Sequence, residues 1–198
     1  MLATGSIYDQ QTPLRLLFHQ TPIVPAVRKV EQLERALSTS ARLIFVLGGD
    51  PESCEPTLTR IAAAGKVAIL NLDLMNGLSR DRYAVNFVRR CGARGIISTH
   101  LDALRFARTQ GMYAVQRTFL VDSGAMETIF TQLKNSPIDA LEVLPALAAP
   151  KLLDRARSMA PELPVMGGGL LNTMKEVEAL LEQGLSAVSV SNPEMWIC

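Results

Sequence analysis

Short apolar runs alternate with longer stretches of helical spacing along most of the chain, from Pro22 to its end. Each run is β-branched or uniformly apolar and stops at glycine, proline or a polar residue, which is typical of a buried strand. Eight runs are present, and they begin near Ile23, Leu43, Val67, Gly95, Met112, Ala140, Val165 and Ala187. The spacing between them predicts helices over residues 29–38, 53–64, 80–91, 101–110, 123–134, 148–160 and 172–183.

Repeated strand–helix alternation indicates a parallel sheet covered by helices, because parallel neighbours need crossover connections. Eight units predict closure into an α/β fold, the TIM (β/α)8 barrel, with a short final helix from Pro193. The alternative is an open doubly wound sheet, which commonly carries a Gly-x-Gly-x-x-Gly turn after its first strand. Here that strand ends in Pro25-Ala26-Val27-Arg28, without glycine. The barrel is therefore the preferred fold.

The composition indicates one globular domain. Residues 1–20 are polar and turn-rich, so we expect an N-terminal extension packed loosely on the body, and residues 21–198 then form a single TIM-barrel domain. No stretch is long and apolar enough for a signal sequence or a membrane span. Cys54, Cys91 and Cys198 lie far apart without metal-ligand spacing, which predicts reduced thiols, no metal site and a cytoplasmic protein.

The segment from Pro164 to Trp196 contains two turns that should expose backbone amides. Gly167-Gly168-Gly169 ends one predicted strand, and the missing side chains let a ligand approach the N–H groups closely. Ser191-Asn192-Pro193 ends the next strand, where Asn192 can cap a new helix. Because the loops after the last two strands of a TIM barrel commonly bind phosphate, we predict a phosphate site here. The alternative is that the glycines only make a tight turn.

Polar residues at the ends of the predicted strands should gather at one mouth of the barrel, where function collects. Asp73 and Glu142 interrupt apolar runs, so we expect partly buried carboxylates that need a partner such as Arg28 or Arg117. These pairs would either form a ring that only holds the mouth together, or bind a phosphate and the hydroxyls of a small polyol. The other polar residues at strand ends are Asp50, Asn71, Ser98, Thr99, His100 and Gln116.

An enzymatic alternative would use Asp73 and Glu142 for proton transfer, with His100 nearby. It corresponds to a phosphate-handling TIM-barrel enzyme, such as a sugar-phosphate isomerase, lyase or diesterase. No nucleophile elbow, triad order or metal-binding carboxylate cluster accompanies the two carboxylates in the sequence, so no catalytic residue is assigned.

A basic segment lies in the middle of a chain whose net charge is only +1. Arg82 and Arg89 share one face of a predicted helix, with Arg90 beside them, and Tyr83 and Phe87 are expected to face inward. Such a belt is a candidate RNA footprint, although charged outer faces of barrel helices are often simply solvated or paired with acids. Aromatic residues make up 5% of the chain, which argues against an aromatic sheet that reads RNA. The arginines of the segment are Arg80, Arg82, Arg89, Arg90, Arg94, Arg105, Arg108 and Arg117, against Asp81 and Asp102.

Six strings, in order along the chain, carry a family resemblance. They are IVPAVR (23–28), LDLMNGL (72–78), GIIST (95–99), VQRTFLVD (115–122), LEVLP (141–145) and SNPEMW (191–196). Over nearly the whole body, the chain resembles the glycerol uptake operon antiterminator family of glycerol-3-phosphate-responsive regulators. The resemblance implies a TIM barrel without enzymatic activity. It also implies that ligand binding lets the protein act on leader mRNA and prevent early termination of transcription of glycerol-metabolism genes.

The resemblance also implies a set of site residues. The ligand-binding residues are expected to be Arg28, Asp73, Gln116, Arg117, Glu142, Gly168, Gly169, Ser191 and Asn192. The RNA-binding residues are expected, from the basic segment rather than from the resemblance, to be Arg80, Arg82, Arg89 and Arg90. The implied partners are leader mRNA and glycerol 3-phosphate or a similar phosphorylated polyol, with no cofactor and no membrane, and a homo-oligomer stays open.

The chain departs from the family pattern at four places around the mouth. They are Gly48, Asn71, His100 and Asn172. Relatives tend to carry an arginine where Asn172 stands, and loss of a cation beside a phosphate removes about 1.5–3 kcal/mol of charge-assisted hydrogen bonding. The departures leave open a paralogue that responds to another small molecule, and a sensor that has lost RNA binding.

Overall fold

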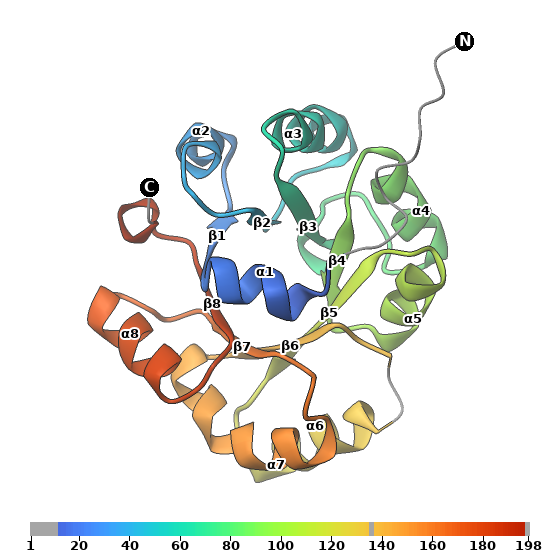
Figure 1. Ribbon diagram of the computed structural model, residues 1–198. Coiled ribbons are helices and arrows are strands. Elements are labelled where there is room, and N and C mark those ends of the chain that lie inside the picture. The colour runs from blue at the N-terminus through green and yellow to red at the C-terminus, as the bar shows by residue number, and fades with distance from the viewer. Residues whose placement is uncertain (1–11, 135–136, 197–198) are drawn as a thin grey trace.

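The computed structural model describes residues 12–134 and 137–196, which form a closed barrel of eight parallel strands in sequential order (Figure 1). β8 pairs with β1 and closes the ring. The predicted TIM barrel is therefore confirmed. The strands are β1 (Ile23–Val27), β2 (Leu43–Val46), β3 (Val67–Asn71), β4 (Gly95–Ser98), β5 (Tyr113–Phe119), β6 (Ala140–Leu144), β7 (Val165–Gly168) and β8 (Ala187–Val190).

Helices surround the barrel and alternate with its strands (Figure 1). The α-helices are α1 (Leu14–Gln20), α2 (Leu33–Leu37), α3 (Pro51–Ala63), α4 (Arg82–Arg90), α5 (Leu101–Thr109), α6 (Ser123–Leu133), α7 (Leu153–Met159) and α8 (Met174–Glu182). Four short 3₁₀ helices complete the described elements: η1 (Val30–Gln32), η2 (Leu72–Leu74), η3 (Ala146–Leu152) and η4 (Pro193–Met195). The short final helix expected from Pro193 is η4.

Successive residues of each strand point alternately into the barrel and toward the helices. On β3, Ile69 packs in the interior cluster with Val24 and Phe45, whereas Leu70 packs with the helices. The same alternation on β5 places Val115 inside and Ala114 outside. Continued toward the carboxyl ends of the strands, it makes Asn71, Arg117, Glu142, Gly168 and Ser189 the inward-facing layer at the mouth.

α1 lies across the centre of the ring and fills the end of the barrel opposite the mouth (Figure 1). Leu14, Leu17 and Phe18 follow helical spacing and are buried against interior residues of the strands. The Tyr113 hydroxyl at the start of β5 donates to the Thr12 carbonyl at 2.6 Å. The expected loose packing of the extension is therefore wrong for residues 14–20. Residues 1–11 lie outside the described part.

Cys54 and Cys91 are buried free thiols, as expected, and Cys198 lies outside the described residues. Burial of Cys54, with the neighbouring Cys91 thiol contributing, raises the pKa of Cys54 to about 12. Within residues 12–134 and 137–196, no helix has the length and apolar character needed to cross a membrane.

The plug formed by α1 should contribute strongly to stability. Phe18→Ala removes a fully buried ring and should lower the free energy of unfolding by about 3–5 kcal/mol. Leu16→Ala is the matched control, because Leu16 lies on the same helix but is 48% exposed, and it should change stability by about 0.5 kcal/mol or less. Urea unfolding of both variants measures the difference. Equal, small effects would show that α1 is dispensable.

Candidate functional site

A buried ion pair lies at the mouth of the barrel. Arg117 on β5 and Glu142 on β6 are register partners, and the Arg117 Nε donates to Glu142 Oε2 at 2.8 Å. Ser189 on β8 donates its hydroxyl to the other carboxylate oxygen, Oε1, at 2.7 Å. Both oxygens of a fully buried carboxylate are therefore satisfied. A guanidinium carries further N–H donors on its two Nη atoms, so Arg117 keeps binding capacity beyond this pair.

Gly168 is required by this ion pair rather than by a turn. A Cβ atom at this position would lie 2.6 Å from Ser189 Oγ and 2.8 Å from Glu142 Oε1, which is closer than real contacts allow. Gly168 is itself buried at the end of β7. Its missing side chain is therefore the space in which the carboxylate of Glu142 meets the hydroxyl of Ser189.

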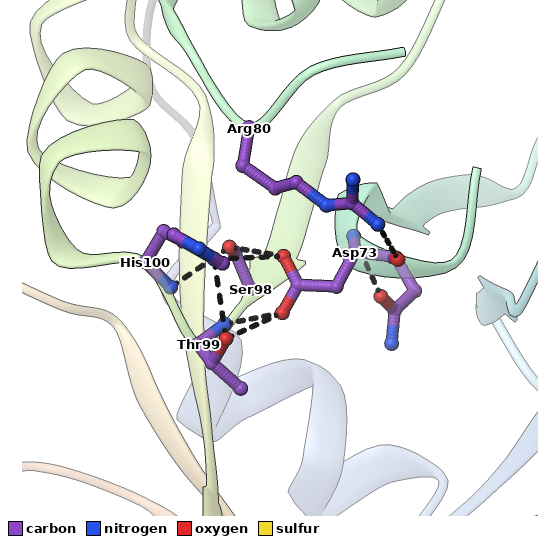
Figure 2. A network of polar contacts seen from close by, with 6 residues as sticks. Asp73, Arg80, Ser98, Thr99 and His100 are labelled. Atoms are coloured by element: carbon purple, nitrogen blue, oxygen red, sulfur yellow. Dashed lines mark hydrogen bonds and ion pairs between the residues drawn. The ribbon is translucent and has the colours of Figure 1, made fainter. Parts of the chain in front are cut away.

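Asp73, which follows β3, is held by the end of β4 (Figure 2). Its Oδ1 accepts from the Ser98 hydroxyl at 2.6 Å, and its Oδ2 accepts from the Thr99 amide at 2.7 Å and the Thr99 hydroxyl at 2.8 Å. The His100 Nδ1 lies 3.4 Å from Oδ1, and Arg80 donates to the backbone carbonyl of Asp73 at 2.6 Å. Asp73 therefore ties the loop after β3 to the loop after β4.

These contacts keep Asp73 ionised. Burial alone would raise the pKa of Asp73, but the hydrogen bonds from Ser98 and Thr99, together with the nearby His100 ring, hold that pKa below its ordinary value. A carboxylate with this many donors is a poor general base, because accepting a proton would cost hydrogen bonds to its charged form.

Asn71 has a polar atom without a partner. Its Oδ1 accepts from the Asp73 amide at 3.0 Å and caps η2. Its Nδ2 is buried and, among the described residues, has no hydrogen-bond acceptor. An unsatisfied buried donor costs about 1–3 kcal/mol, so this amide group marks a position where a ligand oxygen or a water would be stabilised.

The glycine turn and the Ser-Asn turn lie next to each other, because β7 and β8 pair with Gly168 opposite Ser189. The two amides that directly precede α8 are nevertheless already used. Glu176 folds back so that its carboxylate accepts from the amides of Asn172 at 2.8 Å and Thr173 at 2.9 Å. This capping box places the protein's own anion at the helix start. An external phosphate could use these amides only by displacing Glu176.

We call six residues at this end of the barrel the mouth residues: Asn71, Asp73, Arg117, Glu142, Gly168 and Ser189. They form two groups, Asn71 with Asp73, and Glu142 with Arg117 and Ser189 beside Gly168. Asn71 and Ser189 were not among the predicted ligand residues, because a buried apolar run does not show in the sequence which of its faces points inward.

The remaining predicted ligand residues are placed differently. Arg28, Gly169, Ser191 and Asn192 lie exposed at the rim, where the Asn192 side chain caps η4 and the Ser191 carbonyl accepts from Gln32 at 3.3 Å. Gln116, also predicted to bind the ligand, lies outside the inward-facing layer, because its side chain points out of the barrel and donates to Gln132 on α6 at 2.6 Å. Arg117, the next residue along the strand, occupies the inward position.

Asp73 should make the stability of the protein pH-dependent. Because its pKa is lowered on folding, its contribution is complete above the unfolded value of about 3.9 and is lost as the pH falls through the lower folded value. Asp73→Asn should therefore destabilise by about 1–3 kcal/mol at neutral pH, with the difference shrinking below about pH 4. Unfolding curves at several pH values measure this difference in stability. The control is Asp154→Asn at an exposed position of α7, which should change the free energy of unfolding little. A constant difference at all pH values would contradict the assignment.

Gly168→Ala should disturb the mouth directly. The added methyl group collides with Ser189 and Glu142, so we expect a loss of about 1–3 kcal/mol in the free energy of unfolding. The control is Gly124→Ala in α6, where the new Cβ would make one ordinary contact at 3.4 Å and stability should stay within about 1 kcal/mol. Thermal unfolding compares the two. Equal tolerance of both substitutions would mean that the mouth network is loosely held.

Similarities to known proteins agree with this architecture. The sequence profile of the family described as glycerol-3-phosphate responsive antiterminator matches residues 23–196. YgcP of Escherichia coli (strain K12) is 31% identical over 185 residues, which cover 93% of this chain and 96% of that protein. QR15, an aldolase, reaches a TM-score of 0.69 at 12% identity, covering 90% of this chain and 93% of its own, which is a likeness in fold alone.

Two solved structures are similar in both sequence and fold. A glycerol uptake operon antiterminator regulatory protein from Listeria monocytogenes superposes with a TM-score of 0.82 at 29% identity, covering 89% of this chain and 95% of its own. A glycerol uptake operon antiterminator-related protein from Thermotoga maritima MSB8 gives 0.79 at 29% identity, covering 88% and 96%. The chain therefore belongs to the glycerol-3-phosphate responsive antiterminator family.

Proposed function

We propose that this protein is a transcriptional antiterminator that binds leader mRNA of glycerol-metabolism genes in the cytoplasm when glycerol 3-phosphate, or a related phosphorylated polyol, occupies the barrel mouth. Membership of the family supports the regulatory role. The observation that carries the ligand proposal is the unsatisfied Asn71 Nδ2 in the same inward-facing layer as the buried Arg117. A donor and a cation directed at one space suit a small anionic ligand with hydroxyl groups.

The mouth offers different chemistry to the two ends of such a ligand. The Nη groups of Arg117 suit phosphate oxygens, which a planar guanidinium binds in pairs. Asn71 supplies a neutral donor for a hydroxyl oxygen. Arg28, Ser191 and Asn192 at the rim, with the exposed backbone of Gly169, would complete the site after loop closure. The amides of Asn172 and Thr173, just before α8, are a weaker candidate for phosphate, because Glu176 already occupies them.

The proposed RNA contacts concentrate on α4. Arg105 pairs with Asp102 at 2.9 Å and Arg108 with Asp139 at 2.5 Å, so these two arginines are engaged within the protein. Arg80, expected to bind RNA, instead donates to the Asp73 carbonyl. Arg82, Arg89 and Arg90 remain exposed on one helix and are the main candidates for phosphate contacts.

The segment between η2 and α4 would connect the two sites. Asn71 caps its first residues, Asp73 is fixed to β4, and Arg80 holds the segment against Asp73. Asp81 then caps α4 through the amides of Tyr83 and Ala84. A ligand bonded to Asn71 would therefore favour one arrangement of the chain that leads directly into the RNA-binding helix.

The enzymatic alternative has less support. Glu142 is bonded to Arg117 and Ser189, and Asp73 to Ser98 and Thr99, so neither carboxylate is poised for proton transfer. Among the described residues, no group of three or more His, Cys, Asp or Glu could hold a metal ion.

The proposal is tested by measuring affinity for a leader RNA with and without glycerol 3-phosphate. Wild-type protein should bind more tightly when the ligand is present. Asn71→Asp keeps the oxygen that caps η2 but replaces the free donor with a negative charge. It should weaken glycerol 3-phosphate binding by about tenfold or more, because it removes a hydrogen bond of about 0.5–1.5 kcal/mol to the ligand hydroxyl and adds a negative charge that repels the phosphate. Isothermal titration calorimetry and RNA anisotropy measure the two effects.

The matched control is Asn76→Asp, which makes the same chemical change on the exposed part of the same loop. It should leave ligand affinity unchanged. Equal RNA affinity with and without glycerol 3-phosphate in the wild-type protein would sink the ligand-responsive proposal. Equal ligand affinity of Asn71→Asp and Asn76→Asp would place the ligand elsewhere.

A further inference from the structure

An exposed aromatic ring lies among the arginines of α4. Tyr83 is 67% exposed, although helical spacing predicted that it faces inward. Ala84, Val85 and Val88 form the buried face of α4 instead, which turns Tyr83 toward solvent. An exposed tyrosine ring in the first turn of a helix adds nothing to the hydrophobic core. The role of Tyr83 is therefore inferred from the side chains around it.

Those surroundings are cationic. The guanidinium carbon of Arg82 lies 4.8 Å from the centre of the Tyr83 ring, and an Nη of Arg82 donates to the tyrosine hydroxyl at 2.8 Å. Arg90 lies seven residues after Tyr83, so the two side chains share a helix face, with Arg89 alongside. Within the described part of the chain, neither Arg89 nor Arg90 has an acidic partner at ion-pair distance. No carboxylate occurs between residues 82 and 90.

This combination favours nucleic acid over a protein partner. The outer face of α4 presents one ring and three arginines, with no carboxylate between residues 82 and 90, so its charge is of one sign and matches the phosphate backbone of a nucleic acid. The most exposed apolar side chains of the described residues lie outside α4, at Val30, Phe119, Val121, Leu147 and Leu170. An aromatic ring beside guanidinium groups is the arrangement that single-stranded RNA uses, with bases on the ring and phosphates on the cations.

We propose that Tyr83 stacks on an unpaired base of the leader RNA, while Arg82, Arg89 and Arg90 bind the phosphates on either side of it. This inference rests on the proposed antiterminator function and adds the recognition mode, which is a single-stranded loop rather than a duplex. One ring for one base also agrees with a chain whose aromatic content is too low for an extended stacking sheet. A base in a duplex is stacked on its neighbours and is not available to the ring.

The position of Tyr83 also gives the ligand a route to RNA affinity. Its backbone amide donates to the Asp81 carboxylate that caps α4, at 2.9 Å. Asp81 directly follows the segment that Arg80 holds against Asp73. Ordering of the mouth by ligand would therefore fix the first turn of α4, and with it the ring that meets the base.

The experiment measures anisotropy of a fluorescent leader RNA with its loop unpaired, and of a duplex of the same length, in saturating glycerol 3-phosphate. Tyr83→Ala should weaken loop binding by about 5- to 150-fold, the range for loss of one stacked base. Tyr83→Phe keeps the ring and should bind within about threefold of wild type. Arg89→Ala should reduce the slope of log affinity against log salt by about 1, whereas Tyr83→Ala should leave that slope unchanged.

Each alternative outcome is distinguishable. Failure of the wild-type protein to bind any leader RNA would overturn the proposed function together with this inference. Wild-type affinity in Tyr83→Ala, with ligand-dependent RNA binding intact, would overturn the stacking role and leave the proposed function standing. A change in oligomeric mass of Tyr83→Ala at unchanged RNA affinity would show that α4 is a subunit interface and would also overturn it. Thermal unfolding of Tyr83→Ala checks that the variant is folded. Its melting temperature should stay close to that of the wild type, because an exposed ring should contribute little stability.

Discussion

The buried carboxylate of Glu142 is the constraint on which the mouth of the barrel depends. A charge without solvent access is tolerated only with a cation and hydrogen bonds around it, and Arg117 and Ser189 provide these from β5 and β8. Gly168 on β7 leaves the space in which they meet. Four strands are thus committed to one interaction, and it forms because β5 through β8 are consecutive neighbours in the sheet. Replacing a buried ion pair with apolar residues can be neutral for stability. The presence of the Arg117–Glu142 pair at the mouth is therefore better explained by a role in binding than by a role in stabilising the barrel.

Much of the fold was predictable because the strands of a parallel barrel are buried on both faces. Such strands appear as continuous apolar runs, and seven of the eight predicted starts agree with the structure, with β5 beginning at Tyr113 rather than Met112. α1 was not predictable in the same way. Its seven residues fall below the length at which helical periodicity is informative, and turn-forming residues precede it. It exists because the open end of the barrel needs an apolar cover, which is a tertiary requirement.

The mouth of the barrel was located from sequence more reliably than its side chains were oriented. The ends of the strands were identified correctly, but a run that is apolar on both faces gives no alternation from which to tell inside from outside. Gln116 and Arg117 are adjacent, and only the register of β5 decides that Arg117 faces Glu142. The Thr173-x-x-Glu176 pattern was visible as a capping box, yet its consequence for phosphate binding depends on a contact that only the folded chain makes.

If Asn71 binds the ligand and Tyr83 the RNA, as proposed, the short distance along the chain between them limits what kind of switch this protein can be. A ligand shifts an equilibrium only by its difference in affinity for the two states, and typical couplings of about 1–3 kcal/mol correspond to one or two hydrogen bonds. The hydrogen bond from Arg80 to the Asp73 carbonyl has a free energy in this range, and so does the capping of α4 by Asp81. Under the proposed function, no rearrangement of the barrel would be needed to connect ligand and RNA. Ordering of the loop between η2 and α4 would supply a free energy of this size.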